Sequence, residues 1–169
     1  MALSKEEAAQ RFLGVVCQRN RLVNQLNSAF DAQEEKFLNG GSADPSEVKV
    51  IAADAQRVNR LAIELIDDPY YVWPSGVASH VRTIRQAYIE LSSYYDGVMN
   101  ADSFEEAYYL DGLVTDGATA AQEIRYQLGL PADTSSSCEG KETISESLHQ
   151  EMVERNEYLA SFGKDEARS

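Results

Sequence analysis

The segment VASHVRTIRQAYIELSSYYDGV, residues 77–98, decides the fold class. Its apolar residues recur in alternating steps of four and three, at Val77, Val81, Ile84, Tyr88, Leu91, Tyr95 and Val98. Since this spacing places them on one face of an α-helix, it is typical of the seam along which the helices of a bundle pack. Five segments of the chain have helical spacing, and none has a convincing strand pattern. We therefore predict an all-α fold.

Two helices are expected on the N-terminal side of this segment. The first opens at Ser4, where Glu7 completes a capping box, and ends at the sequence NGG, residues 39–41. Its apolar face consists of Phe12, Val16, Val23, Leu26, Phe30 and Phe37. The second opens with Asp44 as its cap and Pro45 as its first helical residue. Its apolar face consists of Ile51, Ala55, Val58, Ala62 and Leu65.

Two more helices are expected on the C-terminal side. The fourth runs from Ser103 to the sequence GLP, residues 129–131, and the fifth starts at Thr143. Their apolar faces consist of Ala107, Leu110, Val114, Gly117, Ala121, Ile124 and Leu128, and of Ile144, Leu148, Met152, Leu159 and Phe162. Because short links favour antiparallel neighbours, we predict an up-down-up-down four-helix bundle with an additional C-terminal helix. This bundle forms a single domain, residues 1–163, followed by a disordered tail, residues 164–169.

The charge of the chain limits its partners. It carries 28 acidic and 15 basic residues, a formal net charge of −13 over 169 residues. Since an acidic surface repels phosphate backbones and anionic headgroups, we expect no nucleic-acid partner and no direct contact with a membrane surface. No apolar run has the length of a membrane span, and residues 1–10 lack the pattern of a signal peptide. The chain is either cytoplasmic as it stands or a secreted domain without its leader.

Cys17 lies away from the apolar face of the first helix. With Phe12 at zero and 100° added per residue, the apolar face falls within about 60° and Cys17 at about 140°. Another segment must therefore cover this thiol. In an up-down bundle the fourth helix ends near the start of the first, so the loop with Cys138 should emerge there. We favour a Cys17–Cys138 disulfide, and two reduced thiols are the alternative. A metal site or a catalytic thiol fits this acidic, histidine-poor sequence less well.

The segment LSKEEAAQRFLGVVCQRNRLVNQL, residues 3–26, resembles the start of the mature region in actinobacterial secreted lipoproteins. The similarity lies in an acidic helix start, an aromatic residue followed by leucine, a valine followed by cysteine, and an asparagine three residues later. These are Glu6, Glu7, Phe12, Leu13, Val16, Cys17 and Asn20. The resemblance implies an oxidising compartment, a disulfide, and attachment to the membrane only through a lipid anchor outside this chain. It implies no activity.

The sequence DDPYYVWPSG, residues 67–76, gathers two tyrosines and the single tryptophan of the chain between two helices. Such rings form platforms that bind a glycan, a peptide or a protein partner. The alternative is a loop that folds over the end of the bundle and caps its core. Tyr70, Tyr71, Trp73 and His80 are the candidate binding residues.

Several charged residues are candidates for functional groups. Glu146 and His149 have the spacing found in di-iron bundles, but the chain lacks the second Glu-x-x-His that such a site needs. We therefore predict no metal site, no cofactor and no catalytic residue. Arg19 and Asp54 fall on apolar helix faces, where a charge must be paired or must extend to water. A buried Arg19 would otherwise bind an anionic group.

The preferred function is a non-enzymatic, extracytoplasmic helical domain of a cell-surface lipoprotein that binds a protein, peptide or cell-wall partner. One alternative is a cytoplasmic acidic adaptor with free thiols. A metal-carrying helical bundle is the other.

Overall fold

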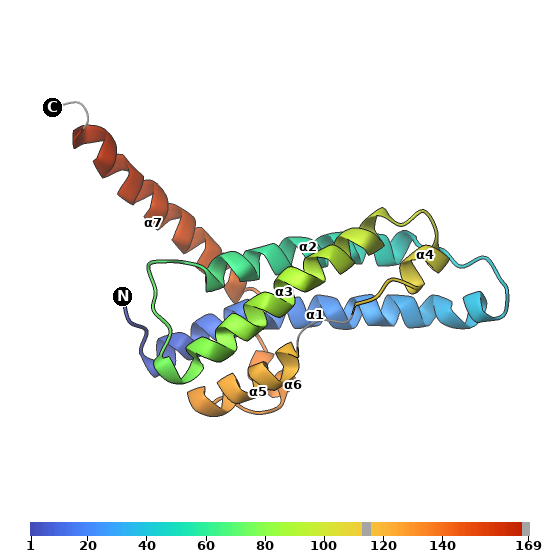
Figure 1. Ribbon diagram of the computed structural model, residues 1–169, viewed down its shortest axis with the longest axis horizontal. Coiled ribbons are helices and arrows are strands. Elements are labelled where there is room, and N and C mark those ends of the chain that lie inside the picture. Colours follow the sequence, from blue (N-terminus) through green and yellow to red (C-terminus); the bar gives the residue numbers. More distant parts are fainter. Residues whose placement is uncertain (113–115, 167–169) are drawn as a thin grey trace.

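The computed structural model describes residues 1–112 and 116–166. Over these residues the chain forms α1 (Lys5–Leu38), α2 (Ser46–Ile66), α3 (Ser75–Asn100), α4 (Phe104–Tyr108), α5 (Gly117–Leu128), α6 (Thr134–Cys138) and α7 (Ile144–Glu166). Within these residues, one isolated β-bridge pairs Ala2 with Val72. The predictions of an all-α fold and of a helical bundle are confirmed (Figure 1).

α1 and α2 lie side by side in opposite directions (Figure 1). Beside the turn that joins them, the Gln33 side chain accepts a hydrogen bond from the backbone N–H of Asp44 at 3.0 Å. At the other end of the pair, the Arg11 guanidinium donates two hydrogen bonds to the carbonyl oxygen of Leu65, at 2.9 and 3.1 Å. Polar contacts therefore hold both ends of this helix pair.

The starts of these two helices follow the predicted chemistry with one change. The capping box of Ser4 and Glu7 is present at the start of α1. At α2 the cap is Pro45 and not Asp44, as the sequence had suggested. Asp44 lies two residues before the helix, and its carboxylate accepts a hydrogen bond from the backbone N–H of Ser46, the first residue of α2, at 2.9 Å.

α3 packs along α2, and its predicted seam is confirmed. Val77, Val81, Ile84, Tyr88, Tyr95 and Val98 are buried, and Leu91 is half-buried. The amide of Asn59, which is fully buried, donates to the carbonyl of Tyr88 at 2.7 Å and to the hydroxyl of Ser92 at 3.0 Å. Near the end of α2, Arg85 of α3 pairs with Asp67. Asp67 comes after Asn59 in the sequence, whereas its partner Arg85 comes before Tyr88, the partner of Asn59. The two helices are therefore antiparallel.

The single fourth helix that the sequence predicted is wrong, because the chain forms two helices there. α4 ends at Tyr108, and α5 starts at Gly117. The new start has a local cause, since the Asp116 carboxylate accepts a hydrogen bond from the backbone N–H of Thr119 at 3.1 Å and so caps α5. The expected stripe residue Val114 lies outside the described residues. α5 packs against α3, whereas α4 covers the far part of the bundle (Figure 1).

The core divides into two clusters along α1. From Ala8 to Gln18, α1 is buried on nearly all sides because α2, α5, α6 and α7 contact it. Further along, α1 meets α2 and α4, and the ring of Phe104 packs against those of Phe30 and Phe37 with centroids 5.7 and 5.5 Å apart. The first cluster is therefore the part of the bundle with the most layers around α1.

α7 begins beside residues 14–18 of α1, runs toward the start of that helix and then leaves the bundle (Figure 1). Gly14 permits the close approach, since a Cβ at this position would lie 2.5 Å from the Cδ1 atom of Leu148. The expectation that Leu159 and Phe162 pack in a stripe is wrong, because both are 54% exposed on the projecting half of the helix. Neither α7 nor any other helix of the described ranges is long and apolar enough to cross a membrane.

The end of the chain was expected to form a disordered tail from residue 164. In the structure α7 extends to Glu166, so the helix includes residues 164–166. Residues 167–169 lie outside the described residues.

Candidate functional site

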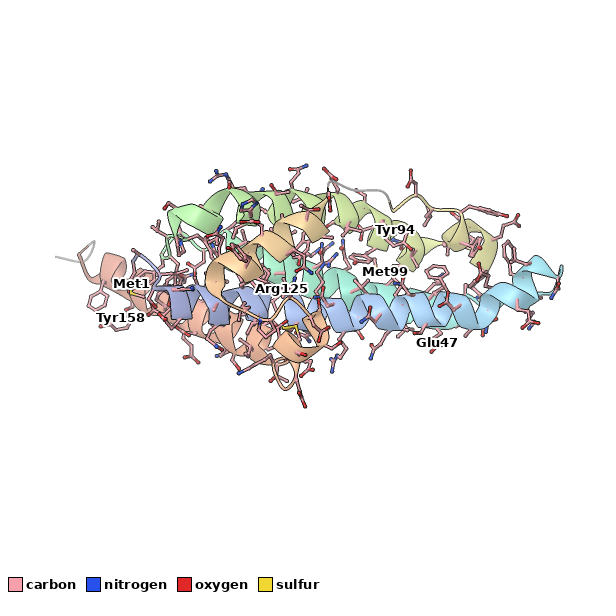
Figure 2. All side chains as sticks on the ribbon, turned by 90° about the horizontal axis from the view of Figure 1, so that it is seen from below. Met1, Glu47, Tyr94, Met99, Arg125 and Tyr158 are labelled. Atoms are coloured by element: carbon pink, nitrogen blue, oxygen red, sulfur yellow. A yellow bond between two sulfur atoms is a disulfide. The ribbon has the colours of Figure 1, made fainter. Side chains whose placement is uncertain are left out.

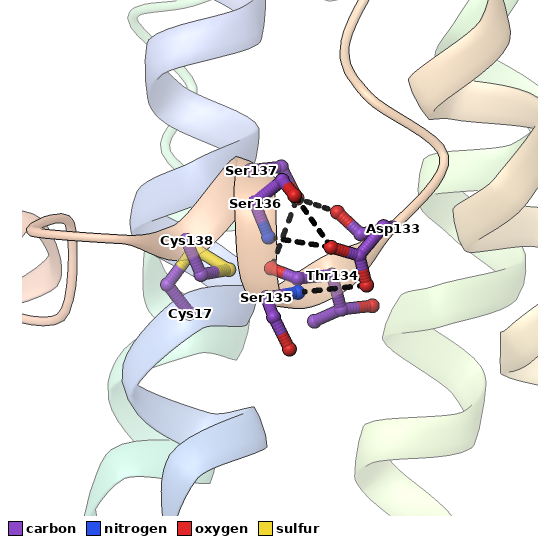
Figure 3. The surroundings of a disulfide bond; sticks show 7 residues. All are labelled: Cys17, Asp133, Thr134, Ser135, Ser136, Ser137 and Cys138. Carbon is purple, nitrogen blue, oxygen red and sulfur yellow. Dashed lines mark hydrogen bonds between the residues drawn. A yellow bond between two sulfur atoms is a disulfide. The ribbon is translucent and has the colours of Figure 1, made fainter.

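A disulfide bond joins Cys17 of α1 to Cys138 at the end of α6 (Figure 3). The predicted pairing is confirmed, and it accounts for a cysteine placed off the apolar face of the first helix. The sequence had suggested a polar loop before Cys138, whereas the structure has the short helix α6 there. Cys17 is 1% exposed and Cys138 is 7% exposed, so α6 covers the flank of α1 at this point.

Asp133 holds α6 in its helical form. Its carboxylate accepts hydrogen bonds from the backbone N–H groups of Ser135 and Ser136, at 3.3 and 2.8 Å (Figure 3). The Ser136 hydroxyl donates a third at 2.6 Å. The Ser136 hydroxyl, followed by its N–H, lowers the pKa of the Asp133 carboxyl. The ionised carboxylate is therefore the form of Asp133 that caps α6 best.

A buried carboxylate lies between two arginines at the end of the bundle near Met1. The Asp68 side chain has no exposed surface, and its oxygens accept hydrogen bonds from Arg11 at 2.8 Å and from Arg155 of α7 at 2.7 Å. Arg11 lies 4.3 Å over the ring of Tyr71, and Arg155 lies 4.5 Å over that of Tyr70. We call these five residues the Asp68 cluster. The sequence does not reveal this cluster, because an aspartate directly before Pro69 is typical of the end of a helix.

The four candidate binding residues do not share one environment. Tyr70 is 42% exposed, while Tyr71, Trp73 and His80 are half-buried. Tyr71 and Trp73 pack against the first core cluster, and His80 lies further along α3. Cys17 lies six residues beyond Arg11, about 9 Å along α1, so the disulfide is not at the end of the bundle beside the tyrosines. The structure brings together the two tyrosines and two arginines.

Glu146 and His149 pair with different neighbours. The His149 ring nitrogen Nε2 lies 2.9 Å from the carboxylate of Glu64, while Glu146 accepts a hydrogen bond from the Gln18 amide at 3.3 Å. Over residues 1–112 and 116–166, no three His, Cys, Asp or Glu side chains converge as metal ligands. These two residues therefore connect α7 to α1 and α2.

The two charges on apolar faces have different surroundings. Asp54 is exposed on α2. Arg19 is half-buried, and its Nε donates to the Asn59 side chain at 3.3 Å while its guanidinium lies 4.1 Å over the ring of Tyr88. Arg19 also lines a cavity between α1, α3 and α5 that it shares with Arg125, a residue that sequence reasoning had not singled out.

No family model matches the chain, and neither a curated protein nor a solved structure is significantly similar to it. The fold and the sites define a class in structural terms: a helical bundle with a disulfide between its first and sixth helices. Its function has to be argued from its own residues.

Proposed function

We propose that the protein is a non-enzymatic domain that works outside the cytoplasm, held at the cell surface by a lipid anchor outside this chain. The Cys17–Cys138 disulfide carries the proposal, because such bonds persist in oxidising compartments and are reduced in the cytoplasm. Both sulfurs belong to buried residues, an environment that favours a structural bond over an exchanging one.

We propose further that this domain binds a protein, peptide or cell-wall partner. Several apolar side chains that are at least 42% exposed lie at the end from which α7 projects. They are Met1, Tyr70, Val72, Tyr158, Leu159 and Phe162, and we call them the end surface. Met1 and Tyr158 lie at the same end of the molecule (Figure 2), and the amino group of Met1 donates to the Tyr70 carbonyl. Grouped exposed apolar residues are typical of interaction surfaces.

The first experiment measures the cysteines in the cells that produce the protein. The cells are lysed in denaturant with one alkylating reagent, and the protein is then reduced and treated with a second, heavier reagent. We expect the peptides of Cys17 and Cys138 to carry only the second label. If both carried the first, the bond would not exist in the cell, and the cytoplasmic acidic adaptor would replace the proposal.

The second experiment measures binding at the end surface. The purified, oxidised domain is mixed with isolated envelopes of the producing cells and sedimented. We expect retention of the wild-type protein and its loss in a variant with Tyr158→Ser and Phe162→Ser. Tyr126→Ser is the matched control, since Tyr126 is 79% exposed on α5. Equal retention of all three proteins would show that the end surface does not bind the partner.

A further inference from the structure

A cavity of about 380 Å³ lies between α1, α3 and α5. Its apolar wall includes Val16, Ile84 and Leu91, and its polar wall includes the guanidinium groups of Arg19 and Arg125. Among the described residues that line it there is no aspartate or glutamate, although the chain carries 28 acidic residues. The cavity is therefore a basic site inside an acidic protein.

Arg125 is a buried cation that forms no ion pair with any carboxylate of the described residues. It is 3% exposed, and within the described part of the chain its Nε is buried with no hydrogen-bond partner. Within the described ranges, the carboxylate that acts on it is Asp133, which lies beyond ion-pair distance and caps α6. Arg11, which is 4% exposed, differs completely, because it donates three hydrogen bonds. Buried guanidinium groups ordinarily have such partners.

Arg19 provides a second positive charge at the same cavity. Its one hydrogen bond goes to the neutral amide oxygen of Asn59, so no carboxylate neutralises it among the residues that the structure describes. Burial raises the pKa of the Tyr88 phenol, and both Arg19 and Arg125 act against that shift. The two guanidinium groups therefore lie within electrostatic reach of one hydroxyl on the cavity wall.

We propose that this cavity binds a small organic anion, with its carboxylate or phosphate group against Arg19 and Arg125 and its apolar body against Val16, Ile84 and Leu91. Guanidinium groups bind planar carboxylates and phosphates through paired N–H donors, which is the partner that Arg125 lacks. The volume lies within the range of small-molecule sites in proteins. This inference holds for either compartment and is independent of the end surface.

Calorimetric titration of the purified, oxidised chain tests the proposal with three probes of similar shape. Benzoate and phenyl phosphate carry the two head groups, and benzamide is the neutral match. At constant ionic strength we expect at least one of the anions to bind and benzamide not to bind, and the tighter anion identifies the head group. If neither anion binds, or if benzamide binds as tightly as the anions, the proposal is wrong.

Substitution of the arginine locates the binding. Arg125→Met keeps the length of the side chain and removes its charge, so we expect affinity for the anion to fall by about tenfold or more. The same variant should have a higher unfolding temperature than wild type without ligand, because a buried unpaired charge is removed. Arg82→Met, at an exposed position of α3, is the control and should bind like wild type.

Two results would overturn this assignment of the site. One is an Arg125→Met variant that binds the anion as tightly as wild type. If that variant does not fold, Arg19→Met gives the same comparison, and wild-type affinity in that variant is the second overturning result.

Discussion

At the scale of single residues, the protein contains two buried arginines with different surroundings. Arg11 shares the carboxylate of Asp68 with the half-buried Arg155, whereas Arg125 forms no ion pair with an acid among the residues that the structure describes. Removing one member of a buried ion pair is costly because the other charge stays behind without compensation. The two sites should therefore respond to mutation in opposite ways: loss of the Asp68 charge should destabilise the fold, and loss of the Arg125 charge should stabilise it.

Asp68→Ala should lower the free energy of unfolding by about 3–5 kcal/mol, since it leaves two guanidinium groups without their carboxylate. Asp67→Ala is the matched control at the neighbouring position. Asp67 pairs with Arg85 on the surface, and loss of an exposed pair costs about 0.2–1 kcal/mol. Urea unfolding of both variants measures the difference. Equal effects would contradict a special role for the buried carboxylate.

Stability should fall in acid partly through Asp133. Hydrogen bonds from Ser136 lower the folded-state pKa of this carboxyl below its ordinary value, which is about 3.9. The folded state thus binds the proton more weakly than the unfolded state, so the contribution of the cap is complete above about pH 4–5 and is lost as pH falls through the folded-state pKa.

Urea unfolding between pH 6 and pH 3 checks this pH dependence. Asp133→Asn keeps an oxygen acceptor and removes the titration, so we expect its stability to fall less steeply in acid than that of wild type. Asp54→Asn, at an exposed position without a capping bond, should follow wild type. If all three proteins lost stability in parallel, the cap would not be the acid-sensitive group.

At the scale of the helices, the sequence predicted the elements whose apolar spacing and caps agree, and it missed one break that the apolar spacing hides and one buried charge. The seam of α3 and the extent of α1 follow from periodicity and caps within each segment. The break between α4 and α5 was missed because the apolar spacing continues through it, while the Asp116 cap acts locally. The role of Arg125 was hidden for another reason. It follows Ile124 on a helix flank, where a charge ordinarily reaches water.

The close contact between α1 and α7 depends on Gly14, which has no side chain. Gly14→Ala would place a Cβ 2.5 Å from Leu148 and 3.1 Å from Ile144, so the Leu148 side chain or α7 itself must shift. We expect the unfolding free energy to fall by about 1–3 kcal/mol, as in other overpacked interiors. Adding Leu148→Ala removes the clash and should make the change at Gly14 neutral or favourable in that background. Urea unfolding of wild type, Gly14→Ala, Leu148→Ala and the double variant measures this coupling. If the two single changes in unfolding free energy simply added, the two side chains would not clash.

At the scale of the whole molecule, one covalent bond connects parts that are 121 residues apart in the sequence. It was predictable because Cys17 lies off the apolar face of its helix, so a distant segment had to cover it. Its effect on stability comes mainly from the unfolded chain, which the bond keeps compact.

The variant with both Cys17→Ser and Cys138→Ser should unfold with a free energy lower by about 4–5 kcal/mol, the value expected for a closed loop of this length. Wild-type protein that has been reduced and alkylated should lose a similar amount. Urea midpoints of the oxidised, reduced and double-serine proteins give the comparison. A double-serine variant as stable as the oxidised protein would show that the bond does not stabilise the fold.

The position of this bond also determines what a protease can do to the domain. Because α2 to α5 lie between the two cysteines, one peptide cleavage in the exposed turn at residues 39–41 would open a ring and release no fragment. The clipped molecule would migrate at full size on a gel until a reductant separated its two pieces. A domain that meets hydrolytic enzymes outside the cell would thus survive its first cut as one particle.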